Sequence, residues 1–315
     1  MLLMLKYALL SATVLMLVAL GGCFSEHSGV INLALEGIMV IGGLVGTMAL
    51  NLLPADMANV WKVTISICLS AAAGVLYSSL LAFSAINLKA DQTIGGTALN
   101  QFAPAFAVVM TWAIQGQGLT TIFIPNWVRI TRDTFGLAPV DGPSFWNNLI
   151  FKYFYLTTPV AIVLFIAAYI VMYKTRFGLR LRACGEHPQA ADSVGINVYK
   201  MRYAGVLLSG ALGAIGGLAY IVPPVQTWNF EVGVAGAGFL ALAVMIFGQW
   251  KPFNICAAAM FFAVFKSLAN IADSTFLAQL HWSSNIYNMM PFIASMIILA
   301  FTSKNSMAPK AEGIP

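Results

Sequence analysis

The chain has 315 residues, of which 60% are hydrophobic and 9% are charged. This composition excludes an ordinary soluble globular protein, in which charged residues are far more frequent. The net charge of +5 comes from a few loops beside apolar segments, a pattern that indicates membrane orientation rather than nucleic-acid binding. The four cysteines have neither metal-ligand nor redox spacing. We therefore predict an all-α fold, that of a polytopic membrane protein.

Apolar segments long enough to cross a membrane core of about 30 Å recur along the whole chain. We predict about nine, within a range of eight to ten, at residues 5–24, 30–50, 60–83, 95–114, 149–173, 203–222, 235–247, 253–269 and 286–301. The first ends in LGGC, as a lipoprotein signal does, but the apolar segments continue, so it is interpreted as a span. The seventh is short and glycine-rich, which is typical of a broken or re-entrant helix.

The basic loops set the expected orientation. With residues 174–202 in the cytosol, alternation of the spans places Lys89, Lys251 and Lys310 on the cytosolic side and residues 115–148 on the outer side. Aromatic residues in that outer segment suggest a lid, or a belt at the headgroups. Residues 1–303 are expected to form one transmembrane domain, and residues 304–315 a disordered cytosolic tail. The expected location is the bacterial inner (plasma) membrane.

The longest polar run, KTRFGLRLRACGEHPQAADSVGINVYKMR at residues 174–202, holds six basic and two acidic residues. Pro188 suits the first position of a helix and Gly195 the left-handed residue after its end. A helix of roughly seven residues is below the ~12–15 needed for marginal stability in water. It therefore needs a surface to dock on, and Ala190 and Ala191 would allow close approach. The alternative is a loop that is basic only through the positive-inside rule.

Polar residues inside the spans are the candidates for a solute pathway. Asn32 and Glu36 lie one helical turn apart, and they either line a route or cap a helix break between Gly29 and Gly37. Three amides enter the fourth span, and they either bind a neutral solute or link helices. These are Gln92, Asn100 and Gln101.

Two glycine-rich segments carry packing and capping signals. Ser209, Gly213 and Gly217 follow the four-residue spacing of small residues that lets helices approach closely. The glycines that open residues 233–252 could expose helix-terminal N–H groups to a ligand. Neither G-x4-GK[ST] nor H-E-x-x-H nor G-x-S-x-G occurs in the sequence, so enzymatic activity is not expected.

The stretches SGVINLALEG (28–37), KADQTIGGTALN (89–100), the run from 175 to 219, and GFLALAVMIFGQWKP (238–252) resemble a known family. It comprises the permease subunits of bacterial ABC importers of the ribose/branched-chain amino-acid superfamily, and the similarity is closest to its nucleoside and simple-sugar branch. The resemblance implies a cytosolic coupling helix that contacts an ATPase subunit. Its residues would be Glu186, Pro188, Ala190, Ala191, Gly195 and Ile196, although His187, Pro188 and Gln189 interrupt the usual E-A-A order.

The resemblance also implies partners: ABC ATPase subunits, a second permease subunit and an extracytoplasmic substrate-binding lipoprotein. This chain itself would bind no cofactor, because ATP and magnesium would belong to the ATPase. The implied function is ATP-driven import of nucleosides, with a simple sugar or a flavin as alternative solute. Outside this class, an ion-coupled secondary transporter stays open, and it would need its own ion-coupling carboxylate, for which Glu36 is the candidate.

Overall fold

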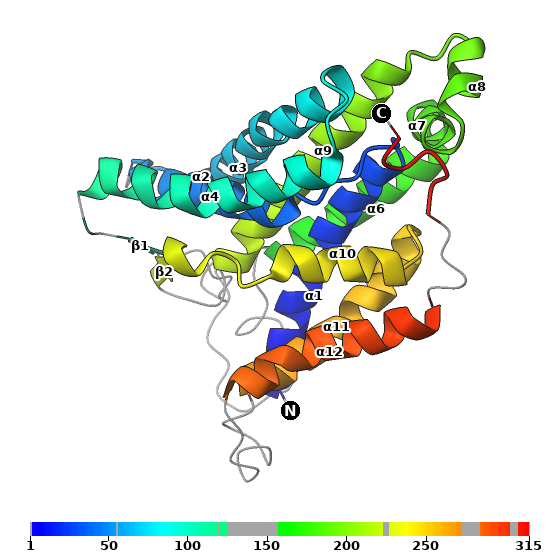
Figure 1. Cartoon of the computed structure of the whole chain (residues 1–315). Coiled ribbons are helices and arrows are strands. Elements are labelled where there is room, and N and C mark those ends of the chain that lie inside the picture. The colour runs from blue at the N-terminus through cyan, green and yellow to red at the C-terminus, as the bar shows by residue number, and fades with distance from the viewer. Residues whose placement is uncertain are drawn as a thin grey trace.

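The computed structural model describes residues 2–54, 56–116, 118, 120–124, 157–222, 227–271, 284–302 and 308–314. Within these ranges the regular structure is almost entirely helical, which confirms the predicted fold class (Figure 1). The helices are α1 (Leu2–Glu26), α2 (Leu35–Leu52), α3 (Asn59–Ala82), the π-helix η1 (Phe83–Asn87), α4 (Gln92–Gln115), α6 (Thr157–Lys174), α7 (Arg176–Glu186), α8 (Pro188–Ser193), α9 (Val198–Ile221), the 3-10 helix η5 (Phe230–Val232), α10 (Ala237–Phe247), α11 (Pro252–Ile271) and α12 (Ser284–Thr302).

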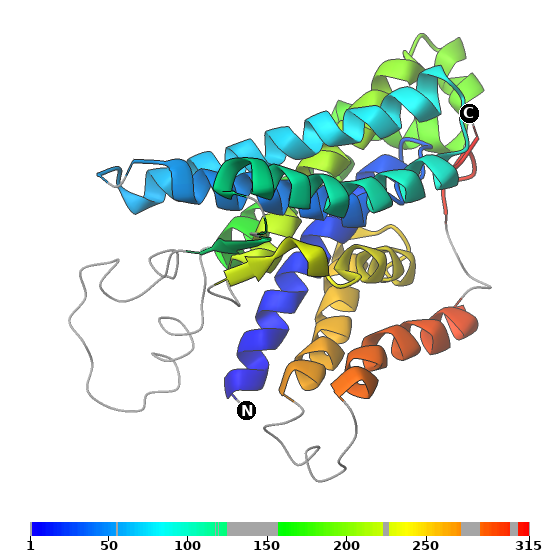
Figure 2. The ribbon, with the colours of Figure 1, turned by 60° about the vertical axis from the view of Figure 1, so that its left-hand side comes forward.

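Helices α1 and α9 form the centre of the molecule. Helix α9 packs against α1, α2 and α3, and α1 packs in addition against α6, α10 and α11. Figures 1 and 2 show α3 and α4 side by side on one flank of this centre, and α11 and α12 on the other. The first apolar segment is therefore a core helix of the fold, which agrees with its interpretation as a span.

Seven of the described helices are long and apolar enough to cross a membrane: α1, α2, α3 continued by η1, α4, α6, α9 and α11. Helix α10 is apolar but has only 11 residues, as its glycine-rich start led us to expect. The predicted total of nine spans remains a prediction. Part of the fifth span and the aromatic outer segment fall within residues 125–156, outside the described residues.

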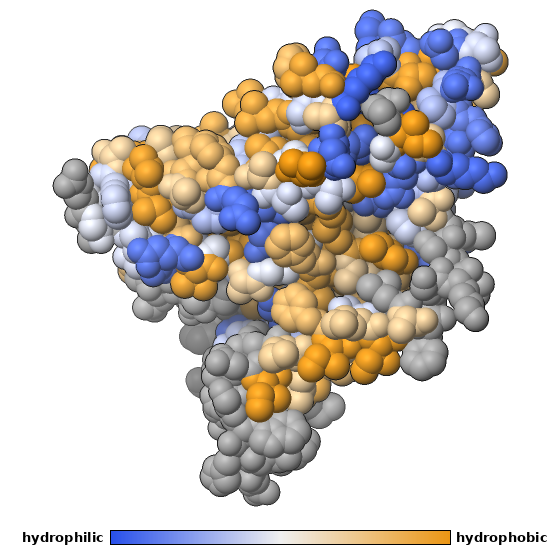
Figure 3. Space-filling model, in the orientation of Figure 1, coloured by the Kyte–Doolittle hydropathy of each residue, from blue (hydrophilic) through white to orange (hydrophobic). Residues whose placement is uncertain are grey.

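Apolar side chains also face outward. Leu76 on α3, Val163 on α6 and Met296 on α12 are more than half exposed, as expected of surfaces that contact lipid. Hydrophilic residues gather instead at the end of the molecule that carries α7 and α8 (Figure 3). This polar end corresponds to the basic loop assigned to the cytosol.

At the opposite end lies a small antiparallel ribbon of β1 (Thr121–Phe123) and β2 (Thr227–Asn229). Ile122 is paired with Trp228, whose indole packs edge-on against the Tyr220 ring with centroids 5.7 Å apart. The ribbon thus joins the segment predicted to lie on the outer side to the connection between α9 and α10.

The tail differs from its expected disorder, because residues 308–314 pack against the polar end. The Ala311 N–H donates to the Gly185 carbonyl (2.8 Å), and the Gly313 N–H donates to that of Gly29 (3.2 Å). Ala311 is 4% exposed. Composition alone suggested disorder, but these contacts depend on backbone groups distant in sequence.

Candidate functional site

Helix α7 anchors the basic loop to the body of the protein. The Thr175 hydroxyl caps it by accepting from the Gly178 N–H (3.2 Å), and Leu181 and Cys184 are buried on its inner face. Burial raises the pKa of the Cys184 thiol above its usual value. A methyl group on Gly185 would come within 2.4 Å of the His27 carbonyl oxygen, so α7 touches the connection between α1 and α2 backbone to backbone. This helix was not predicted from the sequence.

The short helix α8 follows the predicted local rules. Pro188 occupies the first turn, and Gly195 has φ of +80°, as predicted. The Ile196 N–H donates to the Ala191 carbonyl (3.0 Å), and the Gly195 N–H donates to that of Asp192 (2.9 Å). This pair of bonds is the Schellman motif that ends helices at a left-handed glycine. The backbone prediction for this segment is therefore confirmed.

One face of α8 is open. Ala191 is 3% exposed and faces its own chain, whereas Glu186 and Ala190 are exposed and Val194 is 74% exposed. These residues, together with Ala183, His187 and Ile196, border a shallow hollow beside the helix. The arrangement combines small side chains, an exposed apolar residue and a carboxylate on a rigid turn. Such a surface fits a partner protein better than a small solute.

Three predicted pathway residues hydrogen-bond to the backbone of residues 31–37, which form the connection between α1 and α2 and the first turn of α2. The Asn32 side chain accepts from the Ala34 N–H (3.0 Å) and donates to the Ser209 hydroxyl (2.8 Å). Asn100 accepts from the Gly37 N–H (2.7 Å) and donates to the Leu33 carbonyl (2.6 Å). Gln92 accepts from the Ile31 N–H (2.7 Å). Broken backbone at membrane depth requires such partners.

Glu36 caps the short helix α10. Its two carboxylate oxygens accept from the N–H groups of Gly236 (2.8 Å) and Gly238 (2.6 Å), where the helix N-terminus favours negative charge. The capping interpretation is thus the one that the geometry favours. The helix-terminal N–H groups considered for a ligand are occupied by this side chain. Gln101 is exposed on α4.

The small residues of α9 pack as predicted. A methyl group on Gly217 would lie 2.0 Å from the Met39 carbonyl oxygen of α2, and one on Gly213 would lie 3.1 Å from Ile38. Ser209 receives the bond from Asn32. Their counterparts on the neighbouring helices, Gly42 and Gly74, approach α9 at similar distances and were not predicted from the sequence.

A second polar cluster at the same end was also missed. Glu26, 3% exposed, accepts from the Trp250 indole N–H, and the His27 ring lies 3.1 Å from the Trp250 carbonyl oxygen. Burial is the main cause that lowers the pKa of His27. Trp250 stands in the GQWKP turn with φ of +56°. In the described ranges, no group of three or more His, Cys, Asp or Glu side chains is placed to hold a metal ion.

Comparison with known proteins bears on this arrangement. The family described as branched-chain amino acid transport system / permease component matches residues 4–300. The chain belongs to this family. It is 40% identical over 309 residues to the nucleoside ABC transporter permease protein NupC of Lactococcus lactis subsp. cremoris (strain MG1363), covering 97% of this chain and 94% of that protein.

Two further relatives extend the comparison. The guanosine ABC transporter permease protein NupQ of Bacillus subtilis (strain 168) is 37% identical, covering 98% of this chain and 94% of the relative. The putative glucose ABC transporter permease protein TsgC13 of Haloferax volcanii is 30% identical, covering 85% and 77%. No solved structure matches. The chain is thus an ABC transporter permease, a multi-pass cell-membrane protein and a transport subunit rather than an enzyme.

Proposed function

We propose that this chain forms the translocation pathway of an ATP-driven nucleoside importer and that α8 is its coupling helix. The observation that supports the proposal best is α8 itself, a six-residue helix fixed at both ends with an exposed face. A helix this short is not stable alone. Its anchored form suits transmission of force from another protein.

The anchoring suggests how motion reaches the spans. Helix α8 continues through Asn197, which caps α9 by accepting from the Lys200 N–H (2.9 Å), into the central helix of the fold. Helix α7 is pressed against the end of α1. A push on α8 by an ATPase subunit would therefore act on α9 and α1, the two helices around which the others pack.

The solute class rests on the relatives. Those with names specifying nucleoside and guanosine transport match nearly the full chain, so nucleosides are the proposed solutes. A simple sugar is the second candidate, because a putative glucose permease also matches. The proposed partners are ATPase subunits, a second permease subunit and a substrate-binding lipoprotein.

An ion-coupled carrier is the less favoured mechanism. It needs a carboxylate free to gain and lose an ion, whereas both oxygens of Glu36 hold backbone N–H groups of α10. Reconstitution without ATPase subunits separates the two mechanisms. Uptake driven by an ion gradient alone would contradict an ATP-driven importer.

The coupling role is tested by Gly195→Val. Gly195 has φ of +80° with no atom within 4 Å of an added Cβ, so a β-branched residue there strains the backbone without a clash. We expect ATP-dependent guanosine uptake in proteoliposomes to fall at least tenfold, about 1.4 kcal/mol of lost coupling, while ATP hydrolysis continues.

Gly116→Val is the matched control, because Gly116 has φ of +106° and equally open surroundings but lies at the end of α4. It also forces a β-branched residue into a positive-φ conformation, but away from α8. Equal uptake in the two variants would remove α8 from the coupling role.

A further inference from the structure

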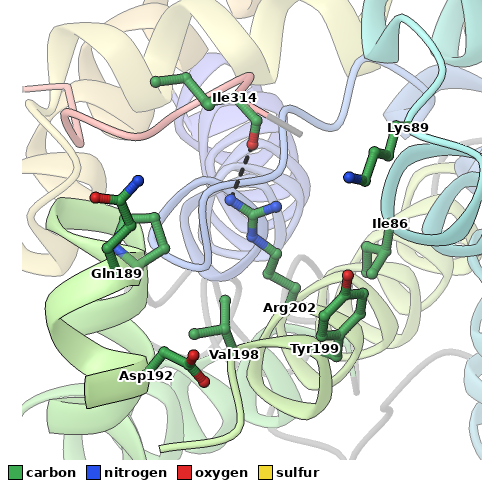
Figure 4. Close-up of a pocket in the computed structure, with 9 residues that line it drawn as sticks. Ile86, Lys89, Gln189, Asp192, Val198, Tyr199, Arg202 and Ile314 are labelled. Atoms are coloured by element: carbon green, nitrogen blue, oxygen red, sulfur yellow. Dashed lines mark hydrogen bonds between the residues drawn. The ribbon is translucent and has the colours of Figure 1, made fainter. Parts of the chain in front are cut away.

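A pocket of about 280 Å³ lies between the coupling helix α8, the start of α9, the turn after η1, and the tail. Figure 4 shows that its walls come from three parts of the chain that are distant in sequence: the end of η1 with the turn after it, the stretch from α8 to the start of α9, and the tail. This volume is close to the lower end of the roughly 300–1,000 Å³ found for small-molecule sites. The pocket is separate from the hollow on the outer face of α8.

Positive charge dominates this pocket. Arg202 is 7% exposed, and its guanidinium donates to the Ile314 carbonyl (2.9 Å), but its buried Nε has no partner among the described residues. Lys89, in a left-handed conformation (φ +50°), directs its side chain toward the same space (Figure 4). Asp192 is the acidic residue among those that line the pocket. A buried guanidinium without a carboxylate partner is unfavourable, so the pocket suits an anion.

The other walls add features that a bare anion does not need. The Tyr199 side chain is 59% exposed and borders the pocket, which offers a ring face on which a base can stack. Gln189 and Asp192 from α8 supply hydrogen-bonding groups on the opposite side (Figure 4). Arginine and lysine are the usual phosphate-binding side chains. Phosphate-binding cations, an aromatic face and polar side chains together match a mononucleotide.

We propose that this pocket binds a nucleoside monophosphate, with its phosphate at Arg202 and Lys89 and its base on Tyr199. The ligand would contact α8 and α9 together, and so would hold the coupling helix in one position and slow transport. The proposal rests on the proposed function, since the ligand is the phosphorylated form of the proposed solute. An anionic lipid headgroup carries the same phosphate chemistry, and the experiment separates the two sources.

The binding test uses the complete transporter in nanodiscs of neutral lipid, titrated with guanosine monophosphate, inorganic phosphate or guanosine. We expect the monophosphate to bind at least tenfold more tightly than either other probe. Lys89→Ala should weaken its binding at least tenfold, and Tyr199→Ala should weaken it without affecting inorganic phosphate. Lys200→Ala is the matched control, because Lys200 is an exposed neighbour on α9 that does not line the pocket. It should change binding less than twofold.

The functional arm measures ATP-dependent guanosine uptake with guanosine monophosphate on the side of α8. We expect inhibition in wild type and Lys200→Ala, and at least tenfold weaker inhibition in Lys89→Ala. Equal binding or inhibition in the two lysine variants would overturn the site. If phosphatidylglycerol in the nanodiscs prevents guanosine monophosphate from binding, the pocket is assigned to a lipid headgroup instead. If guanosine is not transported while the monophosphate still binds through Lys89, the proposed solute fails rather than the pocket.

Discussion

Two carboxyl groups meet where the tail joins the body. The Glu312 carboxyl hydrogen-bonds to that of Glu26, which also holds the Trp250 indole. Burial raises the pKa of Glu312 above its usual value. Cys23 of α1 is fully buried and interacts with Glu26, and the His27 ring contacts the carbonyl oxygen of the same Trp250. One shared proton between the two carboxyls would relieve their repulsion, so attachment of the tail is linked to proton binding.

This linkage predicts a pH-dependent tail. Because the attached Glu312 has a raised pKa, attachment is strongest below the ordinary glutamate pKa of about 4.3 and weakens as pH rises through the raised value. Hydrogen exchange at the Ala311 and Gly313 amides, corrected for intrinsic rates, should therefore accelerate with pH. Glu312→Gln should remove most of the acceleration, whereas Lys310→Gln, at an exposed position, should keep it. A protection factor independent of pH in the wild type would refute the linkage.

The polar residues of the spans show what sequence can and cannot resolve at this scale. Asn32, Asn100 and Glu36 were recognised as unusual, but their chemistry suits a solute and a broken backbone equally. The structure gives each of them a structural role, because each holds a backbone group, and loss of the side chain would leave a buried N–H or C=O unpaired at a cost of about 1–3 kcal/mol. Their place on a solute pathway stays a prediction. These hydrogen-bond partners could not be predicted from the sequence, because they lie far apart along the chain; Glu36 and Gly236 are 200 positions apart.

At the scale of elements, the small-residue face of α9 gives a graded test. Gly217→Ala would place a methyl group 2.0 Å from the Met39 backbone oxygen, which cannot move without shifting α2. We expect a loss of about 3 kcal/mol, at the upper end of overpacking costs, seen as a lower melting temperature in detergent. Gly213→Ala meets the Ile38 side chain at 3.1 Å, which can adjust, and gains helix propensity of about 1 kcal/mol. Equal melting temperatures would contradict the close α2–α9 contact.

Elements were predictable where their signals are local. Helix α8 follows from Pro188 and Gly195, and the short α10 follows from the glycines before it. Helix α7 was not predicted because its arginines made the segment look like a polar loop, although Leu181 and Cys184 form a buried inner face. The tail was missed because composition says nothing about the distant carbonyl groups of Gly29 and Gly185 that it binds.

For the whole molecule, the predicted orientation places separate loops at one end. The structure brings Lys89 and Ile314 to one pocket, and His27 to the Trp250 turn, beside the basic loop. The positive-inside rule groups these loops from their charge alone. The packing of the helices groups them through contacts. Two arguments of different kinds thus converge on a polar end that carries α8 and the tail (Figures 1 and 3).

Labelling with a membrane-impermeant maleimide would test that orientation directly. In a background with Cys68 and Cys256 replaced by serine, Cys23 and Cys184 remain buried and unreactive. We expect Asp56→Cys, in the exposed connection between α2 and α3, to react in intact cells, and Val194→Cys and Lys310→Cys to react only in inverted vesicles. Bound ATPase subunits should protect Val194→Cys but not Lys310→Cys, because Val194 borders the exposed face of α8. Labelling of Lys310→Cys from outside intact cells would reverse the orientation and place α8 beyond the reach of a cytosolic ATPase.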